Sequence, residues 1–79
     1  MKFETHTTIV TNDNEIRIDI ENNLFELTLE GYHMYTLGEP VALFKSEKER
    51  IGTAIPNKVS WYDEKTVLHY QLVSLHSVN

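Results

Sequence analysis

The chain has 79 residues, no cysteine and a formal net charge of −5. Its length fits one small domain, and the lack of cysteine excludes disulfides and thiolate metal sites. With 41% hydrophobic, 10% aromatic and 24% charged residues, its composition is that of a globular protein rather than a disordered or membrane one. We therefore expect a single domain over residues 1–79.

The N-terminal residues lack the apolar stretch of a signal peptide, and no apolar run reaches the roughly 20 residues of a membrane span. We expect a cytoplasmic location and no membrane partner. Residues 1–40 carry two basic and eight acidic side chains, whereas residues 41–79 carry five basic and four acidic ones. A net acidic chain repels phosphate backbones, which disfavours non-specific nucleic-acid binding.

Regular alternation marks the first elements in chain order. In residues 15–21 isoleucines alternate with charged residues, which predicts a strand with one buried and one wet face. Residues 2–9 alternate in the same way, and the polar residues 11–14 are typical of a turn. Residues 2–20 are therefore predicted to form a hairpin.

Residues 22–31 carry two competing signals. Phe25, Leu27 and Leu29 alternate as in a strand, whereas Asn23 followed by Glu26 fits a helix capping box, with Gly31 as the C-terminal cap. The capping pattern favours a short helix over residues 23–30, and a strand stays open as the alternative. Residues 32–35 then return to a strand-like composition.

Turn residues at 37–40 precede a strand that begins at Val41, and a charged connection at 45–49 follows it. From residue 51 to residue 61, odd-numbered residues are expected to face the core both before and after Pro56. A strand that keeps the same inward face across a proline is predicted to be either an edge strand or a strand bent by a bulge. A tight turn at 63–65 leads into the last strand, residues 66–75. Its apolar parity changes near residues 72–73, which indicates either two apolar faces or a bulge in a central strand.

These elements predict a mainly β fold. The architecture that fits them is a small, partly open β-barrel or a strongly coiled antiparallel sheet of five to six strands, with at most one short helix near residues 23–30.

The side chains that could bind a metal ion or take part in catalysis are scattered along the sequence. The four histidines show no pair at the spacing of two or four residues that places two imidazoles on one metal ion; they are His6, His33, His69 and His76. Asp19 and Glu21 share a strand face, but a solvated strand produces the same spacing. Phosphate-binding glycine loops and nucleophile motifs are absent from the sequence. We therefore predict no catalytic residue, no metal site and no cofactor.

Aromatic residues are the remaining candidates for a binding site. Phe44, Trp61 and Tyr70 lie among apolar residues and are predicted to belong to the core. Three tyrosines and one arginine in the second half are the better surface candidates, because stacking tyrosines beside a cation suit a ligand or single-stranded RNA. The predicted binding residues are Tyr32, Tyr35, Arg50 and Tyr62.

Three segments, residues 31–35, 50–54 and 70–79, resemble a family of short uncharacterised proteins from bacilli and related Gram-positive bacteria. The resemblance covers nearly the whole chain and implies no activity; His33 and Thr36 stand where that family tends to have Arg and Pro. More loosely, the layout is similar to small RNA-binding barrels of the pseudouridine-synthase-associated type.

These observations favour a non-catalytic protein-interaction or binding module, with an unknown protein partner or a homodimer. The alternative is an RNA-binding module of the small-barrel type, in which Tyr35 and Arg50 contact RNA.

Overall fold

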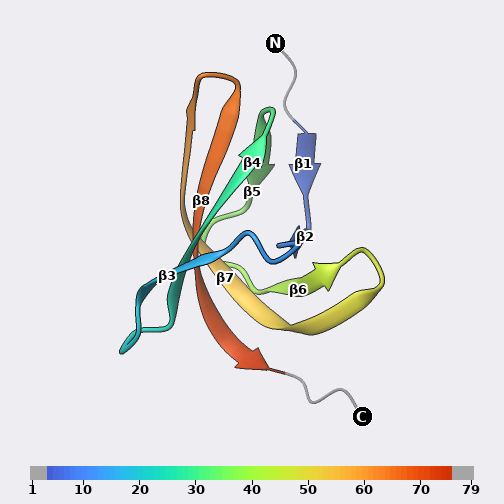
Figure 1. Cartoon of the computed structure of the whole chain (residues 1–79), viewed down its shortest axis with the longest axis vertical. Coiled ribbons are helices and arrows are strands. Elements are labelled where there is room, and N and C mark those ends of the chain that lie inside the picture. The colour runs from blue at the N-terminus through green and yellow to red at the C-terminus, as the bar shows by residue number, and fades with distance from the viewer. Residues whose placement is uncertain (1–3, 76–79) are drawn as a thin grey trace.

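The computed structural model describes residues 4–75, and all regular structure within that range is β (Figure 1). The mainly β prediction is thereby confirmed. Residues 4–75 contain no helix able to cross a membrane. The strands are β1 (Glu4–His6), β2 (Thr8–Val10), β3 (Ile16–Asp19), β4 (Leu24–Glu30), β5 (His33–Tyr35), β6 (Val41–Ser46), β7 (Glu49–Tyr62) and β8 (Lys65–Leu75).

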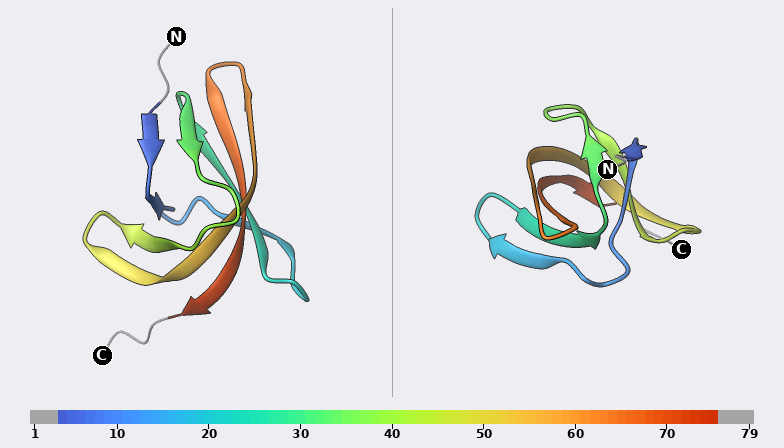
Figure 2. Two further views of the ribbon diagram at one scale, coloured as in Figure 1. Left: turned by 180° about the vertical axis from the view of Figure 1, so that it is seen from behind. Right: turned by 90° about the horizontal axis from the view of Figure 1, so that it is seen from above.

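Six strands form one mixed sheet in the order β2-β6-β7-β8-β4-β3, and β1 pairs with β5 in a separate two-stranded sheet. The larger sheet curls into a half-barrel, which Figure 2 shows from behind and from above. Its inner face holds the core, made of fully or almost fully buried side chains from β2, β4, β5, β6, β7 and β8: Ile9, Leu27, Tyr35, Leu43, Ala54, Leu68 and Tyr70. The partly open barrel predicted from the sequence is confirmed.

The predicted hairpin over residues 2–20 is wrong. β1 pairs in parallel with β5, β2 pairs in parallel with β6, and β3 pairs with β4. Beyond β2, Thr11 N donates to Phe44 O at 2.9 Å and Asn12 N donates to Lys45 O at 2.8 Å, so the chain continues along β6 instead of turning back on itself. Ile9 is paired with Leu43 across that ladder, and both side chains enter the core.

The isoleucine-rich segment forms the predicted strand, β3, but its predicted buried face is wrong. Ile16, Ile18 and Ile20 are 61%, 46% and 74% exposed. β3 is an edge strand, and its register with β4 shifts between Arg17 and Asp19, so the regular alternation of faces is broken.

Residues 24–30 form a strand, so the helix favoured by the capping pattern is wrong. Asn23 has φ 53°, whereas a helix N-cap residue adopts a β-region backbone. Phe25, Leu27 and Leu29 instead alternate towards the core, because β8 provides a seven-residue antiparallel partner for β4. Tertiary pairing thus overrides the local capping signal.

β7 is the predicted bent strand. It lies between β6 and β8 in the sheet, and its register with β8 shifts between Pro56 and Lys58, so the bulge alternative is confirmed. The predicted inward parity is wrong, because the buried residues before the bulge are Gly52, Ala54 and Pro56. After the bulge the phase changes and Val59 packs on the core. Trp61, predicted as core, is 39% exposed.

β8 confirms the predictions made for the last strand. It is central, between β7 and β4. Ala54 pairs with Leu72 and Thr53 with Ser74, so Val73 is the extra residue of a bulge. The turn that precedes β8 has Asp63 at φ 51° and Glu64 at φ 58°, two consecutive left-handed residues as in a type I′ hairpin turn. Of the other predicted core aromatics, Tyr70 is fully buried and Phe44 partly buried.

Candidate functional site

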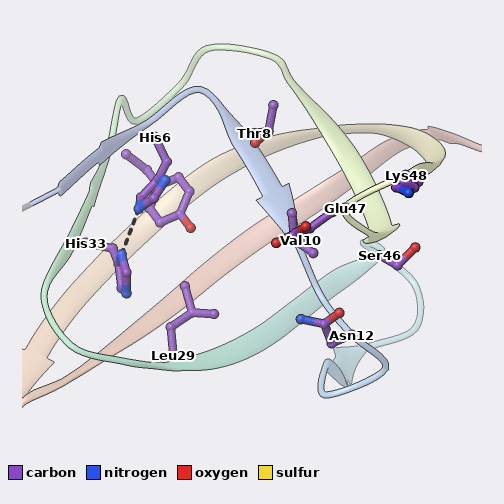
Figure 3. Close-up of a pocket in the computed structure, with 10 residues that line it drawn as sticks. His6, Thr8, Val10, Asn12, Leu29, His33, Ser46, Glu47 and Lys48 are labelled. Atoms are coloured by element: carbon purple, nitrogen blue, oxygen red, sulfur yellow. Dashed lines mark hydrogen bonds between the residues drawn. The ribbon is translucent and has the colours of Figure 1, made fainter.

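A pocket with a volume of about 540 Å³ lies between the edge strand β2, the β4–β5 corner and the β6–β7 turn; Figure 3 shows its lining residues. Successive even-numbered residues from the end of β1 through β2 to the turn after it line the pocket: His6, Thr8, Val10 and Asn12. The intervening Ile9 and Thr11 are buried. Alternation with a period of two therefore places the core on one side of this segment and the pocket on the other.

Two imidazoles stand at one end of the pocket (Figure 3). In the parallel β1–β5 ladder His6 is opposite Tyr35, so His33 lies diagonally across on the same face. The distance from His6 Nε2 to His33 Nδ1 is 2.7 Å, and His33 Nε2 lies 2.6 Å from the carbonyl oxygen of Glu30. A carbonyl only accepts, so His33 Nε2 carries a proton; with His33 neutral, its Nδ1 accepts from His6 Nε2–H.

The main chain of His33 is held from two sides. Its N–H donates to Thr66 Oγ1 at 2.9 Å, and Thr66, fully buried, donates in turn to Gly31 O at 2.8 Å. Trp61 Nε1 donates to His33 O at 2.8 Å. This bond explains why Trp61 remains at the surface. The backbone that carries the imidazole is thus fixed by β7 and β8, two strands of the main sheet.

The far end of the pocket is polar, and its middle is apolar. Val10 from β2 and Leu29 from β4 face the middle, whereas Ser46, Glu47 and Lys48 of the β6–β7 turn close the other end (Figure 3). A volume of this size and a mixed lining are typical of a binding pocket.

Tyr35 forms part of the pocket wall and stacks against His6, with ring centroids 5.6 Å apart. Burial raises the pKa of its hydroxyl from 10.0 to about 12. Burial, and then the charge of Glu15, raise the pKa of Tyr70 as well. The folded state therefore holds both protons more tightly than the unfolded state does.

This pKa shift predicts a loss of stability in alkali. The contribution of Tyr35 is fully present below about pH 10 and is lost as the pH rises through about 12. Between about pH 10 and pH 12, we expect the free energy of unfolding of Tyr35→Phe to fall less steeply with pH than that of the native chain. Urea unfolding at successive pH values measures this slope. Tyr62→Phe, at a residue that is 60% exposed, should leave the slope unchanged. An unchanged slope in Tyr35→Phe would contradict the prediction.

The structure does not bring the four predicted binding residues together. Tyr35 is buried, contrary to its predicted surface position, because β5 packs its ring into the core. The Tyr32 hydroxyl accepts from Glu64 N at 3.1 Å near the β7–β8 turn. Arg50 and Tyr62 stand near opposite ends of β7, roughly 40 Å apart along the strand at 3.3 Å per residue. Arg50 donates to Gly52 O and Thr53 Oγ1, both at 3.4 Å.

Sequence spacing missed the histidine pair. His6 and His33 are 27 residues apart and meet through a parallel pairing that no local pattern reveals. The alternation of residues 2–9 nevertheless placed His6 and Thr8 on the face opposite Ile9. Of the other two histidines, His69 lies on β8 in a second pocket, described next, and His76 lies outside the described residues.

A second, smaller pocket of about 340 Å³ lies on β4, β7 and β8. His69 is paired with Glu26 on one side and with Lys58 on the other, and its Nε2 lies 2.9 Å from Glu26 Oε2. Tyr62 borders this pocket. Lys58, His69 and Glu26 thus form a row of charged and polar groups across three strands. Any solvated sheet face presents such rows, so this one does not by itself indicate a binding site.

Asp19, one of the two paired carboxylates on the β3 segment, is held by Asn22. Asn22 Nδ2 and Asn22 N donate to the Asp19 carboxylate at 2.8 and 3.2 Å, and these bonds lower its pKa. A general acid needs the opposite shift. Glu15, predicted on the wet face, instead turns one carboxylate oxygen, Oε2, into a buried position. Residues 4–75 contain no group of three or more histidine or acidic side chains placed to hold a metal ion.

The fold and the pocket together define a small all-β half-barrel with an open pocket beside one edge strand. A family model described as a domain of unknown function (DUF2584) matches residues 1–79, so the chain belongs to this family. It is 41% identical over 80 residues to the uncharacterized protein YtmB of Bacillus subtilis, covering 100% of this chain and 98% of that protein. The crystal structure of YtmB superposes with a TM-score of 0.92 at 42% identity, covering 100% of this chain and 96% of that one.

Proposed function

We propose that the chain is a non-catalytic protein-interaction module that binds an extended peptide segment of another protein along β2. The observation that carries this proposal is that β2, an edge strand of the sheet, also lines the pocket that contains His6 and His33. In strand addition, main-chain hydrogen bonds to a sheet edge give affinity, and neighbouring pockets select side chains.

The β2 edge has free main-chain groups. In a parallel ladder, alternate residues direct their N–H and C=O groups to the partner strand. Thr11 N bonds to Phe44 O, so Ile9 shares its direction, and Thr8 and Val10 direct their main-chain groups away from β6. Asn12 N also bonds to β6, but Asn12 has a left-handed φ of 49° and lies beyond the regular ladder. The side chains of Thr8 and Val10 line the pocket. One bound segment can therefore bond to the edge and place an apolar side chain between Val10 and Leu29.

A foreign segment fits this site better than a second copy does. A second copy that offered its own β2 would bring Ile9, which is fully buried in its own core, and Val10, which already lines its own pocket. Two copies also carry a formal charge of −5 each and repel one another. RNA is less suited, because Arg50 stands at the opposite end of β7 from Tyr62 and the ring of Tyr35 is buried in the core.

Selection of a random peptide library against the immobilised chain, followed by NMR titration of one enriched synthetic peptide, tests the proposal. We expect amide shifts at Thr8, Val10 and Leu29. Val10→Pro removes an edge N–H that β6 does not use, and we expect it to weaken peptide binding at least tenfold. Ile16→Lys, on the opposite edge strand β3, should not change the affinity.

Val10→Lys keeps the main chain and blocks the pocket, and it serves as the second variant if the proline disturbs folding. Failure to enrich any peptide, or shifts confined to β3, would overturn the proposal. A dimer in light scattering that Val10→Lys dissociates would instead identify a second copy as the occupant. Binding of single-stranded RNA at low salt, unaffected by both Val10 variants, would support the RNA alternative and overturn this one.

A further inference from the structure

The imidazole pair brings together two nitrogen atoms of the kind that bind metal ions. Two ligand nitrogens from separate strands, His6 Nε2 and His33 Nδ1, converge at 2.7 Å at one end of an open pocket. Two nitrogens bound to one ion at 2.0–2.1 Å, with an angle of 90–110° between them, lie roughly 2.9–3.4 Å apart. An opening of a few tenths of an ångström, with rotation of the two rings, is therefore enough to admit an ion.

The surroundings of His33 supply an independent argument. Metal-bound histidines almost always donate their second ring N–H to a carbonyl or carboxylate, which fixes the ring and directs the other lone pair at the ion. His33 Nε2 has this bond, to Glu30 O at 2.6 Å. Its main chain is fixed by Thr66 and Trp61. The Nδ1 lone pair thus points at His6 before any ion is bound.

We propose that His6 and His33 bind one divalent transition-metal ion of the Zn²⁺, Ni²⁺ and Cu²⁺ class. Imidazole nitrogens suit these ions, whereas Mg²⁺ and Ca²⁺ prefer oxygen. On binding, His6 carries its proton on Nδ1 and presents Nε2 to the metal. Water from the open pocket completes the coordination, because the described residues contain no third histidine or acidic side chain placed at this point.

The proposal concerns the two imidazoles of this chain. It is also independent of peptide binding at β2, since the two sites use different atoms and are tested with different probes.

Calorimetric titration of the full chain with ZnCl₂ in a weakly coordinating buffer at pH 7.5 tests the site, with MgCl₂ as the hard-ion comparison. We expect one Zn²⁺ per chain and no heat from Mg²⁺. His6→Gln and His33→Gln should each weaken Zn²⁺ binding at least tenfold. His69→Gln is the matched control, because His69 lies in the second pocket beside Glu26; its affinity for Zn²⁺ should equal that of the native chain.

A direct measurement covers the case in which a histidine variant fails to fold. Long-range ¹H–¹⁵N spectra of the native chain should show Zn²⁺-induced shifts at His6 Nε2 and His33 Nδ1, with His33 Nε2 still protonated. Absence of Zn²⁺ binding at 1 mM metal, a concentration chosen as roughly the weak limit of specific metal modules, would overturn the proposal. Coordination shifts at His69 or His76 alone would also overturn it.

Discussion

Replacing Leu27 by alanine is expected to lower the free energy of unfolding by about 2–5 kcal/mol. Leu27 is fully buried on β4 and belongs to the single cluster of core side chains on the inner face of the half-barrel. Its cross-strand partner, Leu68 on β8, is also fully buried. Truncation removes apolar contacts and leaves a cavity beside Leu68. The surrounding strands cannot move in to close it easily, because β8 is hydrogen-bonded to β4 on one side and to β7 on the other. Urea unfolding monitored by circular dichroism measures the change.

Leu75→Ala is the matched control, because the same chemical change is made at a leucine that is 68% exposed. Its effect should stay within about 0.5 kcal/mol, as is usual for surface substitutions. Equal losses in the two variants would show that the inner face of β4 is not the core, and would contradict the packing described for the half-barrel.

Local signals were sufficient for the turn before β8 and for the bulge within β8. Residues 63–65 were predicted as a tight turn, and the two left-handed residues Asp63 and Glu64 form it. The parity change at Leu72 and Val73 was predicted to reflect either a bulge or two apolar faces, and Val73 is the bulge residue. Neighbours in sequence are partners in space in the β7–β8 hairpin, so its pattern and turn chemistry carry the information.

The N-terminal half could not be predicted in the same way because its partners are distant in sequence. Ile9 pairs with Leu43, and Glu4 pairs with His33, both in parallel. A parallel ladder has no connecting turn that marks it. At residues 23–30 the capping pattern and the alternation conflicted, and only the presence of β8 decides between them. The charged residues of the β3 segment were compatible with a solvated face or a sheet edge, and β3 is an edge strand, but its isoleucines are exposed and not buried as predicted.

The candidate site depends on the same distant pairings. Tyrosines were selected for their ability to stack, but β5 buries Tyr35 and the length of β7 separates Arg50 from Tyr62. The two histidines that do meet lie on strands whose pairing could not be foreseen. The sequence signal that does bear on the site is the alternation at the start of the chain, because it separates the pocket face of β2 from its core face.

Gly52→Ala is expected to destabilise the fold by about 3 kcal/mol, at the upper end of the usual cost of overpacking. Gly52 is buried on β7, with Leu43 of β6 opposite on one side and Leu75 of β8 on the other. A Cβ atom at this position would collide with the carbonyl oxygen of Ser74, and would lie 3.2 Å from its carbonyl carbon. These are main-chain atoms of the neighbouring strand, so relief requires β7 and β8 to move apart. Urea unfolding measures the loss.

Gly38→Ala separates this steric cost from the general cost of replacing a glycine. Gly38 has φ +83° and no atom within 4 Å of an added Cβ, so its replacement costs only the left-handed strain of an alanine, about 1–2 kcal/mol. Amide spectra distinguish the mechanisms further: Gly52→Ala should shift resonances along both β7 and β8, and Gly38→Ala only those around the β5–β6 turn. If Gly52→Ala costs no more than Gly38→Ala, the close approach of the two strands is wrong. A larger cost, with shifts on both strands, means that the close contact of β7 and β8 beside the bulge at Val73 contributes to holding the half-barrel in its curved form.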